Sequence, residues 1–137
     1  MVIPSEYIQI ISAGIYAIAL FFTIVTFWRT KRLDQITLSN NIFSELRNFD
    51  RGLAKIPSGS QYNDARSQWY SRIFNSVNWL SFMLNQKVIS DKKMIEHIKP
   101  IIARYYENTF LKNASADEKG DSNSYQEFKK LYRTIKK

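Results

Sequence analysis

Few side chains in this sequence could support catalysis, and the adjacent pair Glu96 and His97 is the most suggestive. A carboxylate can tune an imidazole that exchanges protons near neutral pH. Neighbouring residues on a helix do not face each other, however, so this pair forms no dyad by itself. An enzyme would need a pocket that holds Glu96, His97 or Glu107. Arg104 and the tyrosines would have to lie beside them.

Composition excludes several other kinds of chemistry. The 137 residues contain no cysteine and one histidine, which excludes a thiol nucleophile, a thiolate metal site and a histidine-rich metal centre. No Gly-rich phosphate loop is visible. We therefore expect no catalytic residues, no metal, no cofactor and no small-molecule substrate.

A long uncharged run dominates the N-terminal part of the chain. From Tyr7 to Trp28 it covers 22 residues and contains no charged side chain. As a helix it would span about 33 Å, which suits a bilayer core of roughly 30 Å. A cleaved signal peptide would need a basic start, which MVIPSE lacks, and a buried core helix would need more protein around it. The run predicts one transmembrane helix.

Flanking charge predicts the orientation of this helix. All 20 Lys and Arg residues lie at or after Arg29, and Arg29, Lys31 and Arg32 follow the run directly. By the positive-inside rule, the N-terminus lies outside and the remainder of the chain is cytoplasmic. We expect a single-pass protein of the cell membrane, in which residues 1–32 form the anchor with its basic stop.

Small residues in the apolar run could let a second helix approach closely. Ala13 and Ala17 have small-xxx-small spacing, and Ser12 and Gly14 lie beside them. The same residue types are common in membrane helices that stay alone. The pattern favours a membrane-protein partner or a homo-oligomer as the binding partner, in addition to the lipid bilayer.

Residues 33–112 read as a cytoplasmic helical domain. Apolar residues recur every three or four positions, and the breaker cluster Ile56–Ser60 separates the first two helices. Ser90 suits the N-cap of the third helix, and Pro100 inside it predicts a kink or a break. Aromatic residues at helical spacing favour a core over a ligand groove, while Asn75, Asn78 and Asn85 could bond across helices or face water. These aromatics are Trp69, Tyr70, Phe74, Trp79, Phe82, Tyr105, Tyr106 and Phe110. The expected helices cover 33–54, 62–85 and 90–112.

The C-terminal part of the sequence is polar and then basic. Residues 113–123 read as a mobile polar linker. A basic helix follows over 124–137, where Ser124 and Glu127 have capping-box spacing. It could lie on anionic lipid headgroups or form a docked helix with a solvated basic face. Nucleic acid is not expected, because no nucleic-acid motif accompanies the charge. The possible headgroup contacts are Lys129, Lys130, Arg133, Lys136 and Lys137.

Three segments carry a resemblance to a known group of proteins. They are Phe74–Asn85, Val88–Asp91 and Ile102–Glu107, in which an aromatic-rich helix is followed by a polar turn and a second helix ending in Tyr-Tyr-Glu. This order is similar to that of a family of small single-pass membrane proteins of archaea and bacteria with a domain of unknown function. The resemblance implies a membrane-anchored α-helical domain and transfers no functional residues.

Together these features predict an all-α protein with one N-terminal transmembrane helix and a small cytoplasmic helical bundle. The expected function is a non-catalytic, membrane-anchored interaction module or an accessory subunit of a membrane protein complex. One alternative is a membrane-surface sensor or effector that acts through its basic tail. The other is a small membrane-bound enzyme using Glu96, His97 or Glu107.

Overall fold

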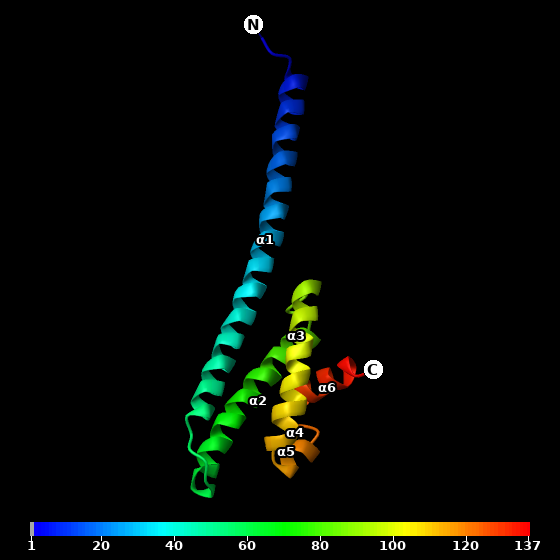
Figure 1. Ribbon diagram of the computed structural model, residues 1–137. Coiled ribbons are helices and arrows are strands. Elements are labelled where there is room, and N and C mark those ends of the chain that lie inside the picture. Colours follow the sequence, from blue (N-terminus) through cyan, green and yellow to red (C-terminus); the bar gives the residue numbers. More distant parts are fainter. Residues whose placement is uncertain (1) are drawn as a thin grey trace. The chain divides into compact units, whose positions relative to one another are not determined.

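The computed structural model describes residues 2–137, and these residues confirm the predicted all-α class because they contain helices and turns but no strand. The first helix, α1, covers Ser5–Ala54 (Figure 1). The chain divides into two compact units, one ending at Asp34 and the other covering Gln35–Lys137.

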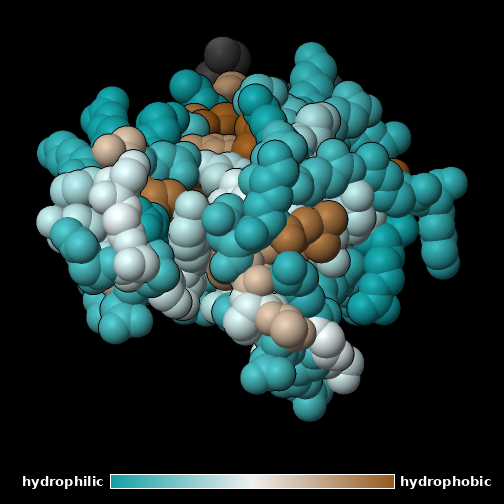
Figure 2. Space-filling model, turned by 60° about the horizontal axis from the view of Figure 1, so that its bottom comes forward, coloured by the Kyte–Doolittle hydropathy of each residue, from teal (hydrophilic) through white to brown (hydrophobic). Residues whose placement is uncertain are grey.

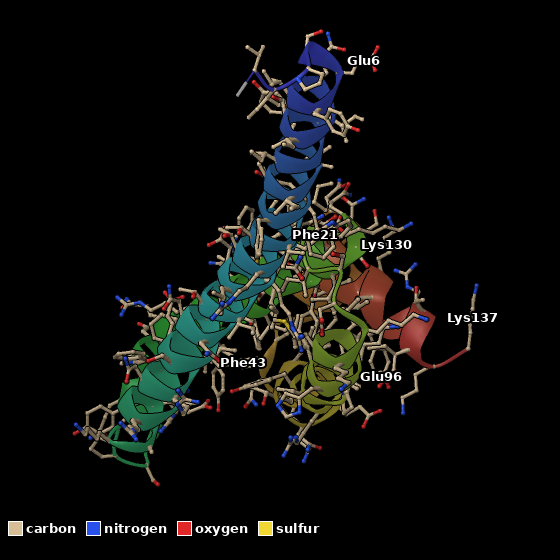
Figure 3. The ribbon with its side chains drawn as sticks, turned by 90° about the horizontal axis from the view of Figure 1, so that it is seen from above. Glu6, Phe21, Phe43, Glu96, Lys130 and Lys137 are labelled. Carbon is tan, nitrogen blue, oxygen red and sulfur yellow. The ribbon has the colours of Figure 1, made fainter. Side chains whose placement is uncertain are left out.

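The first unit consists of the N-terminal part of α1. Its backbone begins with a hydrogen bond from the Tyr7 amide to the Pro4 carbonyl, at 3.1 Å. Glu6 lies in the first turn, where a negative charge complements the helix dipole. The apolar side chains that follow are exposed, with exposed fractions of 61% for Ile15 and 63% for Phe21 (Figure 3). This helix is long and apolar enough to cross a membrane.

The second unit is a bundle with an aromatic core. Helices α2 (Asn63–Asn85), α3 (Lys92–Tyr105) and α6 (Gln126–Ile135) surround it, and α6 packs against both α2 and α3 (Figure 1). Burying each large apolar side chain stabilises the fold by roughly 1.5–3 kcal/mol. The face in Figure 2 is mostly hydrophilic, with a few small hydrophobic patches. The largest fully buried side chains are Phe74, Phe110, Phe128, Leu46, Ile73 and Leu80.

Three phenylalanines join the helices at the centre of this core. The Phe110 ring meets Phe74 at 5.1 Å and Phe128 at 5.5 Å between centroids, both edge to face. Such edge-to-face pairs add about 0.5–1.5 kcal/mol beyond the area they bury. This arrangement confirms the core assignment of the aromatics at Phe74 and Phe110. Trp79 is an exception, because 54% of its surface is exposed.

Residues 35–54 of α1 belong to this bundle and pack along α2. Ile42 and Leu46 are buried, and the Phe49 ring meets the Trp69 ring at 6.0 Å. Trp69 lies so close to Gly52 that an added Cβ would come within 2.6 Å of its ring. The absence of a side chain at position 52 therefore allows the indole to pack against α1.

The N-cap of α3, at the end of the turn that follows α2, is a different residue from the one expected. The cap of α3 is Asp91, whose Oδ1 accepts from the Met94 amide at 3.0 Å. Ser90 was expected there, but its amide and hydroxyl bond the buried side chain of Gln35 instead. Gln35 Oε1 also accepts from the Asp91 amide at 3.2 Å. One amide side chain from α1 thereby holds the start of α3.

The third helix does not break at Pro100. Helix α3 continues to Tyr105 with Pro100 exposed on its surface, where water can satisfy the carbonyl that lost its N–H partner. The irregularity comes later, as the π-helical turn η2 (Tyr106–Phe110) followed by the short helix α4 (Leu111–Asn113). A π-helical turn changes the direction of the side chains that follow it.

The segment expected as a polar linker contains a helix of its own. Helix α5 (Ala116–Gly120) begins with a capping box formed by Ser115 and Glu118. The capping box expected at Ser124 and Glu127 is wrong, because Ser124 donates to Asp121 and Glu127 accepts from Asn85. A short helical turn, η1 (Ser60–Tyr62), precedes α2.

The turn after α2 generates a stability prediction. Lys87 adopts a left-handed φ of 57°, and the amides of Lys87 and Val88 bond the carbonyls of Leu84 and Met83. This is a Schellman motif, whose left-handed position favours glycine. We expect Lys87→Gly to stabilise the domain by about 0.5–1 kcal/mol in thermal unfolding followed by circular dichroism.

Lys130→Gly provides the matched control. Lys130 is exposed in the middle of α6, where glycine is expected to cost about 0.5–1 kcal/mol. Equal destabilisation by both substitutions would contradict the assigned turn.

Candidate functional site

A cleft opens in the second unit between α1 and the α3–η2 segment. Its volume is about 420 Å³, within the range of small-ligand pockets. Apolar side chains from both elements form part of its wall, and two arginines, a carboxylate, a phenol, an amide and a hydroxyl form the rest. The lining residues are Phe43, Arg47, Asp50, Ile101, Arg104, Tyr105, Asn108 and Thr109.

Helical spacing explains how these residues converge. Phe43, Arg47 and Asp50 are three and four positions apart, so they share one face of α1. Ile101 and Arg104 are likewise neighbours on α3. The π-helical turn η2 then presents Asn108 and Thr109 toward the same cleft. Figure 3 labels Phe43 on its helix.

The central polar contact of the cleft joins two helices. Tyr105 donates its hydroxyl hydrogen to Asp50 Oδ2 at 2.8 Å. Burial, and then the hydrogen bond and the charge of Asp50, raise the pKa of the Tyr105 phenol well above its usual value. The nearby guanidiniums of Arg104 and Arg47 act on this pKa in the opposite direction. Tyr105 is therefore a hydrogen-bond donor at neutral pH.

Both arginines of the cleft keep their donors available. Among the residues that the structure describes, no side chain or carbonyl is bonded to the guanidinium of Arg47 or Arg104. Each side chain is exposed and reaches the cleft from a different element. With one carboxylate at Asp50, the lining carries two positive charges against one negative charge.

The residues expected to act in the membrane helix all lie in the first unit. Ala13, Gly14 and Ala17 are exposed and Ser12 is half-buried, and an added Cβ on Gly14 would meet no atom within 4 Å. The small residues are therefore not required by packing inside this unit. Among the three basic residues that follow the apolar run, Lys31 has its amine 5.8 Å from the Trp28 ring centroid. Arg29 and Arg32 are also exposed.

The basic C-terminal helix provides fewer exposed charges than expected. Lys129 is only 5% exposed, and its amine donates to the carbonyls of Glu118 and Asp121, each at 2.5 Å. The expectation that Lys129 contacts lipid headgroups is corrected, because its amine caps the end of α5 inside the domain. Lys130, Arg133 and Lys137 are exposed in the C-terminal segment, and Figure 3 labels the first and last of them.

The residues considered for catalysis lie on the surface. Glu96 and His97 are exposed on α3. Glu107 accepts from the Tyr132 hydroxyl at 2.8 Å and pairs with the Lys136 amine at 2.6 Å. These contacts lower the pKa of Glu107 and raise that of Lys136. Lys136, also expected at a lipid surface, is thus occupied by an ion pair while remaining 55% exposed.

Sequence reasoning found only part of the cleft. Arg104 and the tyrosines were considered for an enzyme pocket, and the structure places Arg104 and Tyr105 in the cleft without Glu96, His97 or Glu107 among its lining residues. Arg47, Asp50 and Asn108 were missed. The available signal was the i, i+3, i+4 placement of Phe43, Arg47 and Asp50 on one helix face.

Comparison with known proteins does not add a relative. No protein-family model matches the chain, and no curated protein and no solved structure matches it. The resemblance to single-pass membrane proteins stays a prediction.

The contact between Asp50 and Tyr105 generates a second prediction. We expect Asp50→Asn to lower the pKa of Tyr105 toward about 10, the usual value for tyrosine, but not fully to it, because burial remains. The measurement is a pH titration of ¹³Cζ-labelled tyrosine by NMR, with Tyr105→Phe to assign the signal.

Asp64→Asn is the control, since Asp64 is an exposed carboxylate in the first turn of α2. The assignment of the cleft contact is wrong if the Tyr105 signal titrates identically in the wild type, Asp50→Asn and Asp64→Asn proteins.

Proposed function

We propose that this protein is a membrane-anchored helical interaction module, which holds a small binding domain at the cytoplasmic face of the cell membrane. One observation supports the anchor most strongly: the run from Tyr7 to Trp28 is helical and uncharged, and every side chain in it except the half-buried Ser12 is exposed. Exposed apolar surface of this extent is unfavourable in water and favourable in hydrocarbon.

The ends of the run support the same proposal. Tyr7 and Trp28 are amphipathic rings of the type that gathers at the two membrane interfaces. The Lys31 amine lies 5.8 Å from the Trp28 ring centroid, so a cation directly follows the proposed second interface. Glu6 at one end and Arg29 at the other bracket the uncharged segment.

Anchoring would benefit a domain that binds rather than reacts. A tethered domain searches the membrane plane, which raises its effective concentration near another membrane protein. The exposed small residues Ala13, Gly14 and Ala17 offer one surface for such a partner or for a second copy of this chain. The bundle supplies a second surface that faces water.

A role through the basic tail alone receives less support. The apolar residues Phe128 and Leu131 of α6 are buried in the core, so this helix cannot insert an apolar face into lipid. Its exposed cations could add about 1 kcal/mol each at an anionic surface. We therefore propose the tail as an accessory to the anchor.

Charge insertion tests the anchor. Replacing Ile18 and Phe21 by arginine places two charges near the centre of the run, at a combined cost of about 5–7 kcal/mol for insertion. We expect the full-length wild type to stay in the membrane pellet after alkaline carbonate washing. The Ile18→Arg, Phe21→Arg variant should move largely to the supernatant.

The matched control is Asn40→Arg with Asn41→Arg, at exposed positions of α1 in the second unit. This pair adds the same charge and should pellet like the wild type. The anchor is refuted if wild type and the Ile18→Arg, Phe21→Arg variant partition alike.

The sidedness of the protein can be tested separately, because the chain contains no cysteine. We expect Ser5→Cys to react with a membrane-impermeant maleimide in intact cells, and Ser122→Cys to react only after permeabilisation. Both serines are exposed, so accessibility reports the side of the membrane. The reverse pattern would show that the domain lies outside and that Arg29, Lys31 and Arg32 do not set the topology.

A further inference from the structure

We propose that the cleft between α1 and the α3–η2 segment binds an organic anion, namely a carboxylate or phosphate group joined to a small apolar body. This inference goes beyond the membrane anchor and does not rest on it, because every lining residue belongs to the unit Gln35–Lys137. The two proposals can therefore fail independently.

The charge of the ligand follows from the two arginines. Arg47 lines the cleft from α1 and Arg104 from α3, and neither guanidinium has a bonded partner among the described residues. A guanidinium presents a planar fork of donors that matches the oxygens of a carboxylate or a phosphate. Two such forks around one cavity favour an oxyanion over a cation.

The single carboxylate in the cleft does not reverse this preference. Asp50 accepts the Tyr105 hydroxyl hydrogen at 2.8 Å, which already occupies one of its oxygens. Its negative charge offsets one arginine and leaves the lining with a net positive charge. The Asn108 amide and the Thr109 hydroxyl add neutral groups that can donate to an anion.

The apolar walls of the cleft determine the size and polarity of the uncharged part of the ligand. Phe43 and Ile101 both line the cleft and are half-buried. The volume of about 420 Å³ exceeds what an inorganic anion fills and accommodates a ring or a short acyl chain. Binding of the anionic group and burial of the apolar body would then occur together.

The experiment uses the full chain in an uncharged maltoside detergent, so that the detergent supplies no anion. Amide signals of Asn108 and Thr109 are followed by NMR during titration with benzoate and phenyl phosphate, and with inorganic phosphate and neutral benzamide as reference probes. We expect saturable shifts with benzoate or phenyl phosphate, weaker binding of inorganic phosphate and no saturation with benzamide.

Three variants assign this binding to the arginines. Arg47→Gln and Arg104→Gln should each weaken binding about tenfold, since each removes charge-assisted hydrogen bonds. Arg104→Lys, which keeps the charge but loses the fork, should fall between Arg104→Gln and the wild type. Arg133→Gln on α6 removes the same charge from an exposed position outside the cleft and should bind like the wild type. Neither cleft arginine bonds another side chain, so the two glutamine substitutions remove no bond that holds the fold. A loss of binding in these variants therefore reports on the site.

A final arm separates a dissolved anion from a lipid headgroup. The full chain is placed in nanodiscs of phosphatidylcholine, with or without phosphatidylglycerol, and the same signals are compared. Arginine-dependent shifts with the soluble probes assign the ligand to solution, and shifts caused only by phosphatidylglycerol assign it to the membrane. The proposal is overturned if no probe and no lipid produces a shift that depends on Arg47 or Arg104, or if benzamide binds as benzoate does.

Discussion

The physical constraint on which the proposed function depends is that one helix, α1, presents two different kinds of side-chain surface along its length. Beyond the first turn of α1 the backbone amides bond carbonyls of the same helix, so the side chains decide where each part is stable. From Tyr7 to Trp28 they are predominantly apolar around the whole circumference, and nearly all are exposed. From Gln35 onward they are buried along one stripe, at Gln35, Ser39, Ile42 and Leu46. We propose that this change from an apolar circumference to a single buried stripe reflects a change of solvent, from hydrocarbon to water.

The second unit combines an apolar core with a small number of polar contacts that fix its register. Phe74, Phe110 and Phe128 pack against one another through apolar contacts, which are not directional and would allow several arrangements of the helices. Directional bonds select one arrangement: Asn78 accepts from the Phe128 amide at 3.0 Å, and Asn85 donates to Glu127 at 2.6 Å. The buried Lys129 amine performs a similar task for α5, and burial lowers the pKa of Lys129. These contacts hold α6 in the bundle with its basic face outward.

The spacing of apolar residues was sufficient to predict the helices of the bundle, but it was insufficient to predict where each helix begins and how it is capped. The expected helix at 62–85 lies close to α2, and the expected helix at 33–54 ends where α1 ends, because apolar spacing reports burial directly. The observed α1 begins at Ser5, so the expected membrane helix and the first cytoplasmic helix form one continuous element. Caps were misplaced because Ser90 and Ser124 have tertiary or loop partners that compete with local capping. Lys129 was misassigned because charge alone suggests a surface position. The cleft was only partly foreseen, since Arg47 and Arg104 lie on segments far apart in the sequence and only the fold brings them together.

The most direct test of the account is the depth of α1 in a bilayer. A spin label is attached to a cysteine introduced at Ile18 of the full chain in phosphatidylcholine nanodiscs, with a label at Asn40 in a second sample as the reference. Electron paramagnetic resonance then compares collisions with oxygen, which concentrates in hydrocarbon, and with a water-soluble nickel complex. The account predicts that the label at position 18 is accessible to oxygen and shielded from nickel, and that the label at position 40 is accessible to nickel. Free access of nickel to position 18 would contradict it.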